Sequence, residues 1–145
     1  MSTSTASKMG IKAGMRAIIL NGHPNEIESI NLPAISLNSV LSGDFDYIHL
    51  FVMSQIEFNQ ELKKVKISIK QKGMLWVSWP KAGKLGTDLN IKNIIKIGYE
   101  HGLVESKCLS INETWSALKF THPKEGKVYN NSYGKLSEPG HGSHV

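Results

Sequence analysis

Short apolar runs alternate along this chain with amphipathic stretches, a pattern typical of α/β proteins. The clearest apolar run spans residues 73–81, holds two tryptophans, and ends in a loop of lysine and glycine. Similar runs at 15–20 and 45–53 predict two more strands, because continuous apolar runs of this length are typical of strands covered on both faces. Residues 34–40 are ambiguous, although they carry apolar residues at alternate positions as a strand does.

Two amphipathic helices are predicted between these strands. The first begins at Ser54, which forms a capping box with Glu57. Its apolar face consists of residues spaced by four, three and four: Phe58, Leu62, Val65 and Ile69. The second has Thr87 or Asp88 as its cap and also carries apolar residues on one face. A brief helix is expected at residues 26–30.

The last apolar segments, 103–111 and 115–121, predict two strands joined by a turn of hairpin length. We therefore expect a single Rossmann-like, three-layer α/β domain at residues 11–121. Its sheet is mostly parallel, and the hairpin adds an antiparallel edge strand. Residues 1–10 and 122–145 are rich in polar and turn residues, so we expect a disordered N-terminal tail and a flexible C-terminal tail.

Charge and composition narrow the classes of partner. The net charge is +5 and the pI about 9.3, but Arg16 is the only arginine and the lysines are scattered. Nucleic-acid recognition favours arginine, so we do not expect nucleic-acid binding. No apolar run approaches the roughly 20 residues of a membrane span. The first residues lack the apolar core of a signal peptide, so a cytoplasmic protein is expected.

Cysteine and histidine usage gives little support for a metal site. Cys108 lies in an apolar context, which predicts a buried and inert thiol. His141 and His144 are joined by no cysteine or carboxylate cluster, so a solvated tail is expected there.

Candidate ligand-binding residues follow from a rule of open α/β sheets, in which ligands lie beyond the carboxyl ends of the strands. The residues selected in this way are Asn21, Gly22, His23, Ser54, Trp79, Lys81, Lys84 and Glu113. His23 could act as a general base, although a local turn role also explains it. Ser54 fits a helix cap better than a nucleophile, and His49 fits a hydrogen-bonded core residue.

The usual nucleotide-binding motifs are not matched. Lys81 and Lys84 precede a predicted helix, whose amino terminus favours anions, but the spacing is not that of G-x-x-x-x-G-K-[ST] and Asp88 would itself occupy that terminus. The turn at residues 21–23 has one glycine, whereas G-x-G-x-x-G requires three. No acid to hold a ribose is visible at the end of a second strand.

Two motifs carry a family resemblance. At residues 75–81 and 113–120, and more briefly at 88–90 and 102–104, the chain resembles a family of small bacterial proteins classed as a domain of unknown function. The resemblance covers roughly residues 10–121 and implies no activity.

More distantly, the order of elements is similar to class I S-adenosylmethionine-dependent methyltransferases, whose sheet also ends in an antiparallel hairpin. That resemblance implies a shared fold, but the glycine-rich cofactor loop is reduced here to residues 21–23.

Three functional hypotheses follow. The first is a non-catalytic module that binds a small molecule or another partner beside His23, Trp79 and Lys81. The second is a degenerate S-adenosylmethionine-dependent methyltransferase or another nucleotide-using enzyme. The third is a structural homo-oligomer. The residues point to no particular cofactor.

Overall fold

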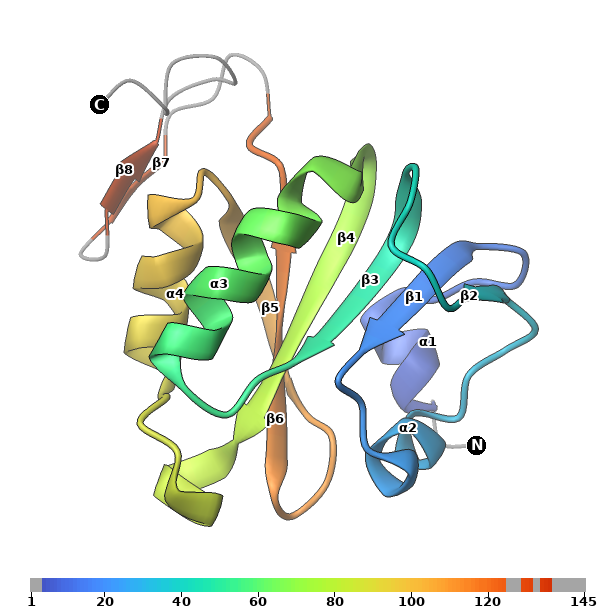
Figure 1. Ribbon diagram of the computed structural model, residues 1–145, viewed down its shortest axis with the longest axis horizontal. Helices are drawn as coiled ribbons and strands as arrows, with labels where there is room; N and C mark the ends of the chain where they lie inside the picture. Colours follow the sequence, from blue (N-terminus) through green and yellow to red (C-terminus); the bar gives the residue numbers. More distant parts are fainter. Residues whose placement is uncertain (1–3, 125–128, 132–133, 137–145) are drawn as a thin grey trace.

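The computed structural model describes residues 4–124, 129–131 and 134–136. In these residues a six-stranded sheet has helices on both faces (Figure 1). The strands of the sheet are β1 (Arg16–Leu20), β2 (Ser36–Asn38), β3 (Phe45–Phe51), β4 (Ile69–Pro80), β5 (Val104–Ser110) and β6 (Trp115–Thr121). The helices are α1 (Thr5–Met9), α2 (Pro24–Ile30), α3 (Gln55–Val65) and α4 (Ile91–Glu100), with 3₁₀ turns η1 (Lys66–Ser68) and η2 (Lys81–Gly86). This is the expected Rossmann-like α/β architecture.

The sheet has the order β2-β1-β3-β4-β6-β5. β1 pairs in parallel with β2 and β3, and β3 pairs in parallel with β4. The ambiguous segment 34–40 therefore contains a true strand. Ile69, expected on the face of the first helix, instead begins β4, because that helix ends in the 3₁₀ turn η1.

The C-terminal hairpin is antiparallel as expected, but its second strand is not at the edge. β6 lies between β4 and β5 and is antiparallel to both. Burial explains this order. Ala117, Leu118 and Phe120 of β6 are buried, whereas Ser106 and Lys107 of β5 are exposed. The more polar strand therefore takes the edge.

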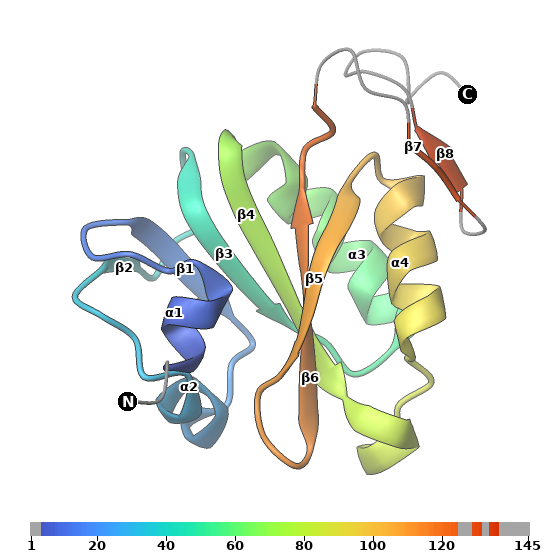
Figure 2. The same ribbon diagram turned by 180° about the vertical axis from the view of Figure 1, so that it is seen from behind.

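Two apolar cores lie on opposite faces of the sheet. One packs the sheet against α3 and α4, and it includes Trp79. The other packs the opposite face against α1 and α2, and it includes Trp76 (Figure 2). The two tryptophans of the 73–81 run therefore point to opposite faces, as alternation along a strand requires.

The N-terminal segment differs from the expected disordered tail. Residues 5–9 form α1, which Ser4 caps through its side chain, and Ala6 and Met9 are buried. The indole Nε1 of Trp76 donates to the Met9 carbonyl at 3.1 Å. Local composition could not reveal this segment, because its order depends on a contact with a residue far along the chain.

Beyond β6, the structure describes β7 (Tyr129–Asn131) and β8 (Gly134–Leu136), which pair with each other in antiparallel fashion. His141 and His144 lie outside the described residues. Within the described part of the chain, no helix is long and apolar enough to cross a membrane.

Candidate functional site

The loops that carry the candidate residues meet at one end of the sheet, where the parallel strands β1, β3 and β4 have their carboxyl ends. This is the lower end in Figure 1. They are the segments after β1, β3 and β4, together with the β5–β6 turn. That turn reaches the same end of the sheet because β6 is antiparallel to β4. Seven of the eight candidates stand on these segments. Trp79 is the eighth, near the end of β4, and it is buried with an exposed fraction of 4%.

His23 is the exposed end of an aromatic column. It is the N-cap residue of α2, and its ring centroid lies 5.1 Å from that of Trp115 and 6.3 Å from that of Phe51. Phe51 in turn stacks on His49, with centroids 4.5 Å apart and planes 12° apart. His23 therefore seals the end of the sheet with ring contacts, which explains the residue without a catalytic role.

Gly22 is closely surrounded by apolar side chains, and there is no open space beside its Cα. Asn21 before it has a left-handed backbone, with φ of 58°. A Cβ at Gly22 would lie 2.8 Å from side-chain carbons of both Ile19 and Ile27. A side chain at this position would force Ile19 or Ile27 to move, because Ile27 of α2 folds back over the turn that follows β1.

A buried hydrogen-bond chain, which sequence reasoning only partly anticipated, lies beneath His23. The Tyr47 hydroxyl is 2.6 Å from His49 Nδ1, and His49 Nε2 is 2.6 Å from Ser78 Oγ. All three side chains are fully buried. Burial lowers the pKa of His49 to about 3 and raises the pKa of Tyr47, so both groups remain neutral at ordinary pH. His49 is confirmed as a core residue, whereas its two partners were not predicted.

The spacing of Tyr47 and His49, two residues apart on one strand, is the sequence signal that could have linked them. Ser78 gave a weaker signal as the one hydroxyl within an apolar run.

The lysines of η2 bind the neighbouring hairpin. Lys81 Nζ donates to Ser110 Oγ, and Lys84 Nζ donates to the Glu113 carbonyl at 2.8 Å. Both partners are neutral oxygens. The same turn is tied to α2, because Asn112 Nδ2 donates to a carboxylate oxygen of Glu26 at 3.0 Å. These bonds join the loops after β1, β4 and β5 into one rim.

The helix amino termini at this end of the sheet are capped by residues of the chain itself. Ser54 Oγ accepts from the Glu57 N–H at 3.1 Å, which confirms Ser54 as a helix cap. The carboxylate of Asp88 accepts from the Gln55 N–H at 2.9 Å. Since carboxylate and hydroxyl oxygens already accept from the Gln55 and Glu57 amides, these two N–H groups at the start of α3 are not available to an anion.

The cap of α4 differs from the expected Thr87 or Asp88. Asn90 and Asn93 form a reciprocal capping box at 2.9 Å in both directions. Thr87 is used elsewhere, because its hydroxyl donates to the Met53 carbonyl. Asp88 is likewise occupied at α3. The sequence pattern located the helix but assigned its cap too early.

Cys108 is exposed, contrary to the expected buried thiol. It lies on β5, and the edge position of that strand leaves its side chains open to solvent. Partial desolvation still raises the pKa of the thiol, although the nearby Lys81 opposes this effect. Among the described residues, no group of three or more His, Cys, Asp or Glu side chains could hold a metal ion.

Comparison with known proteins establishes the fold class. No family model matches the sequence, and no curated protein matches it significantly. Solved structures do match, at 8–12% identity. The ribosomal protein L11 methylase of Lactobacillus delbrueckii subsp. bulgaricus aligns over 83% of this chain and 75% of its own, with a TM-score of 0.57.

Two further structures give the same result. The TehB-like SAM-dependent methyltransferase of Corynebacterium glutamicum aligns over 84% of this chain and 89% of its own, with a TM-score of 0.53 and 8% identity. A S-adenosylmethionine-dependent methyltransferase of Clostridium acetobutylicum aligns over 82% and 88%, with a TM-score of 0.54 and 8% identity. The chain therefore has a methyltransferase-like, Rossmann-like fold.

Proposed function

We propose that this chain is a non-catalytic binding module, which retains a methyltransferase-like fold and engages its ligand or partner at the rim formed by the loops after β1, β4 and β5. The observation that carries the proposal is the closed turn after β1. Ile27 occupies the space over Gly22, and His23 lies against Phe51 and Trp115.

The fold suggests S-adenosylmethionine as a cofactor, and the residues after the first strand do not fit it. A nucleotide site on such a sheet uses glycines that let the backbone approach the ligand closely, and an acid that binds the ribose. Here the approach over Gly22 is filled by side-chain carbons of Ile19 and Ile27.

The end of β2 supports the same proposal. Its last residue is Asn38 rather than an acid, and Asn38 Nδ2 donates to the carbonyls of Ser36 at 2.9 Å and Ala17 at 3.3 Å. Asn38 has an amide side chain that is bonded to the backbone, so this position supplies no carboxylate to bind a ribose. We therefore derive no methyl-transfer step for this chain.

The rim retains exposed polar groups that a partner can reach. His23, Lys84 and Glu113 are exposed, and they come from three different loops. The hydrogen bonds of Lys84 and Asn112 hold these loops together, so a ligand would meet a preorganised surface.

The proposal is tested by NMR. A small-molecule fragment library is added to the isotope-labelled chain, and backbone amide shifts are followed. We expect the shifted amides to cluster at residues 21–23, 81–86 and 112–114. Shifts that scatter over the surface, or that cluster on α3 or α4, would contradict the rim as the binding surface.

The alternative, a degenerate S-adenosylmethionine-dependent methyltransferase, is favoured by one observation: the structural neighbours reported above include enzymes of that class. Thermal melting with S-adenosylmethionine and S-adenosylhomocysteine separates the two hypotheses. A binding module without this cofactor keeps its Tm at millimolar ligand, whereas a residual methyltransferase gains stability from binding.

A further inference from the structure

The net charge of this chain comes from one segment. Residues 54–101 hold nine lysines and four carboxylates, whereas the rest of the chain holds eight basic and eight acidic residues. The lysines are therefore less scattered than we expected. Five of them stand at residues 63–72, a stretch of the sequence without an acidic residue. A charge distribution as uneven as this is typical of proteins that bind an anionic surface.

Residues 63–72 form one end of the molecule. They comprise the last turn of α3, the 3₁₀ turn η1 and the start of β4. Because β4 begins beside Phe45, the first residue of the parallel strand β3, this is the amino end of the strands, the upper end in Figure 1. It lies opposite the rim. We call it the basic surface, and its lysines are exposed except for the half-buried Lys66.

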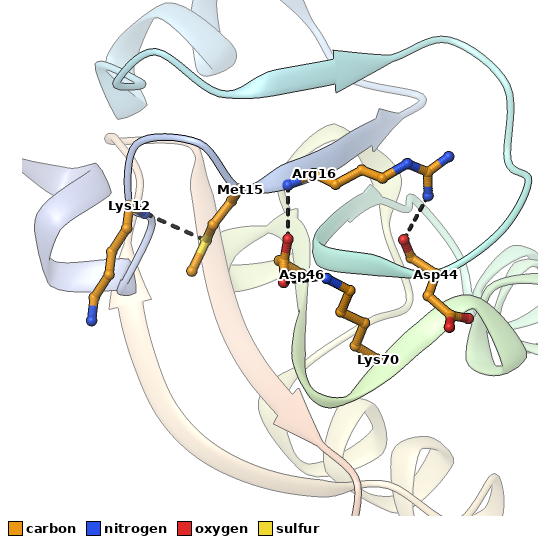
Figure 3. A network of polar contacts seen from close by, with 6 residues as sticks. All are labelled: Lys12, Met15, Arg16, Asp44, Asp46 and Lys70. Carbon is orange, nitrogen blue, oxygen red and sulfur yellow. Dashed lines mark hydrogen bonds and ion pairs between the residues drawn. The ribbon is translucent and has the colours of Figure 1, made fainter.

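Two lysines of the basic surface are paired with carboxylates. Lys64 Nζ lies 3.0 Å from a carboxylate oxygen of Glu61. Lys70 Nζ lies 3.0 Å from a carboxylate oxygen of Asp46, whose other oxygen accepts from the Arg16 N–H at 2.8 Å (Figure 3). These pairs account for only part of the positive charge.

The other three lysines of the basic surface have no carboxylate partner within the described residues: Lys63, Lys66 and Lys72. Lys66 lies against the turn after α4, because a Cβ at Gly102 would be 2.7 Å from its Nζ. Burial lowers the pKa of His101, and the charges of Lys66 and Lys63 lower it further. Lysine charge without a carboxylate partner therefore gathers near this turn.

An exposed apolar side chain stands in the middle of the basic surface. Val65 and Ile69 are buried, whereas Ile67 between them is 83% exposed. A single exposed apolar residue is common on protein surfaces. Here, however, lysines surround it along the chain, and this combination is typical of attachment to anionic membranes. The ammonium groups lie among the lipid headgroups, and the apolar side chain enters the interface.

We propose that the basic surface binds the headgroups of an anionic lipid bilayer, with Ile67 inserted among them. Charge complementarity selects this partner, and the contact needs no helix that spans the membrane. The rim lies at the other end of the sheet, so a chain attached in this way keeps the rim open to solution.

Nucleic acid is the other extended anionic surface, and the residues favour lipid over it. Nucleic-acid binding uses arginine and aromatic stacking. The guanidinium of Arg16, the only arginine, donates to the carbonyls of Ser42 and Asp44 (Figure 3). All three tryptophans and all four phenylalanines are buried. The apolar side chain that the basic surface does expose is aliphatic, which suits acyl chains rather than bases.

Vesicle co-sedimentation of the full chain tests the proposal. We expect binding to vesicles of phosphatidylserine mixed with phosphatidylcholine, no binding to phosphatidylcholine alone, and release at high salt through screening. Lys66→Gln with Lys72→Gln should weaken binding roughly tenfold or more. The matched control is Lys92→Gln with Lys96→Gln, which removes the same charge from exposed side chains of α4 and should bind nearly as well as the unmodified chain.

Ile67→Gln tests the apolar part of the contact, because it keeps every charge. It should weaken binding about fivefold and leave the salt dependence unchanged. Ile56→Gln is its control, since Ile56 is 72% exposed and lies at the other end of α3. That variant should bind as the unmodified chain does.

The proposal would be overturned if the chain did not bind the anionic vesicles. Binding that either the double lysine variant or Ile67→Gln left unchanged would overturn it too. Fluorescence anisotropy with a labelled DNA duplex identifies the other class of partner. A chain that bound the duplex but not the vesicles would assign the basic surface to nucleic acid instead.

Discussion

His49 Nε2 and Ser78 Oγ lie 2.6 Å apart and join two parallel strands inside the sheet, with both side chains fully buried. Because neither group can reach water, each depends on the other for its hydrogen bond. We expect Ser78→Ala to lower the free energy of unfolding by about 1–3 kcal/mol, the cost of leaving a buried polar group unsatisfied. Urea denaturation measures this. The exposed Ser106→Ala should change stability by less than about 0.5 kcal/mol, and equal effects of the two would contradict the assignment.

The same histidine predicts a dependence of stability on pH. Its folded-state pKa is lowered to about 3, while the unfolded value is about 6.5. Between these values the unfolded chain binds the proton and the folded chain does not. Stability is therefore complete above about pH 6.5 and falls as the pH decreases, by up to about 1.4 kcal/mol per pH unit.

Chemical denaturation at pH 6.5, 6.0, 5.5 and 5.0 measures this slope, and His49→Gln should reduce it. His101 also has a lowered pKa, mainly through burial, so part of the slope remains in that variant. A slope that His49→Gln leaves unchanged would show that other groups cause it.

Trp79 is expected to act in the core rather than at the site. Its exposed fraction is 4%, and it packs in the apolar cluster beneath α3 and α4. Trp79→Ala should therefore reduce the free energy of unfolding by about 3–5 kcal/mol. Leu85→Ala is the control at the same end of the sheet, because Leu85 is 61% exposed. If both variants were equally stable, Trp79 would have to be reassigned to a surface role.

Gly98 makes the contact between α4 and the sheet. A Cβ added there would collide with the ring of Phe120, so Gly98→Ala should destabilise the fold by about 1–3 kcal/mol. The double variant Gly98→Ala with Phe120→Leu should recover part of that loss, since the smaller side chain makes room. Thermal melting of Gly98→Ala, Phe120→Leu and the double variant checks this, and additive losses would argue against close packing as the cause.

Much of the fold could be predicted because its strands carry strong apolar patterns. β1, β3, β4 and the hairpin strands lie where continuous or alternating apolar runs occur, and α3 and α4 follow helical spacing. α1 could not be predicted, since it is held in place by contacts with distant residues. One of these is the hydrogen bond from Trp76 to the Met9 carbonyl. The interior place of β6 depended on a choice between two strands of one hairpin, which only packing decides.

The position of the candidate site, at the carboxyl ends of the strands, could be predicted, but the interactions within it could not. The rule of carboxyl strand ends predicted a position for His23, Lys84 and Glu113 that matches the rim in the structure, and their role in ligand binding stays a prediction. The ring contact between His23 and Trp115 joins residues far apart in sequence, so no local pattern announces it.

Isothermal titration calorimetry with S-adenosylmethionine tests the central claim most directly, because it asks whether the closed turn after β1 excludes the cofactor of the structurally similar enzymes. A ligand-binding methyltransferase serves as the positive control. We predict no saturable heat at millimolar S-adenosylmethionine, since Ile27 fills the space over Gly22. Saturable binding with one site per chain would contradict the account.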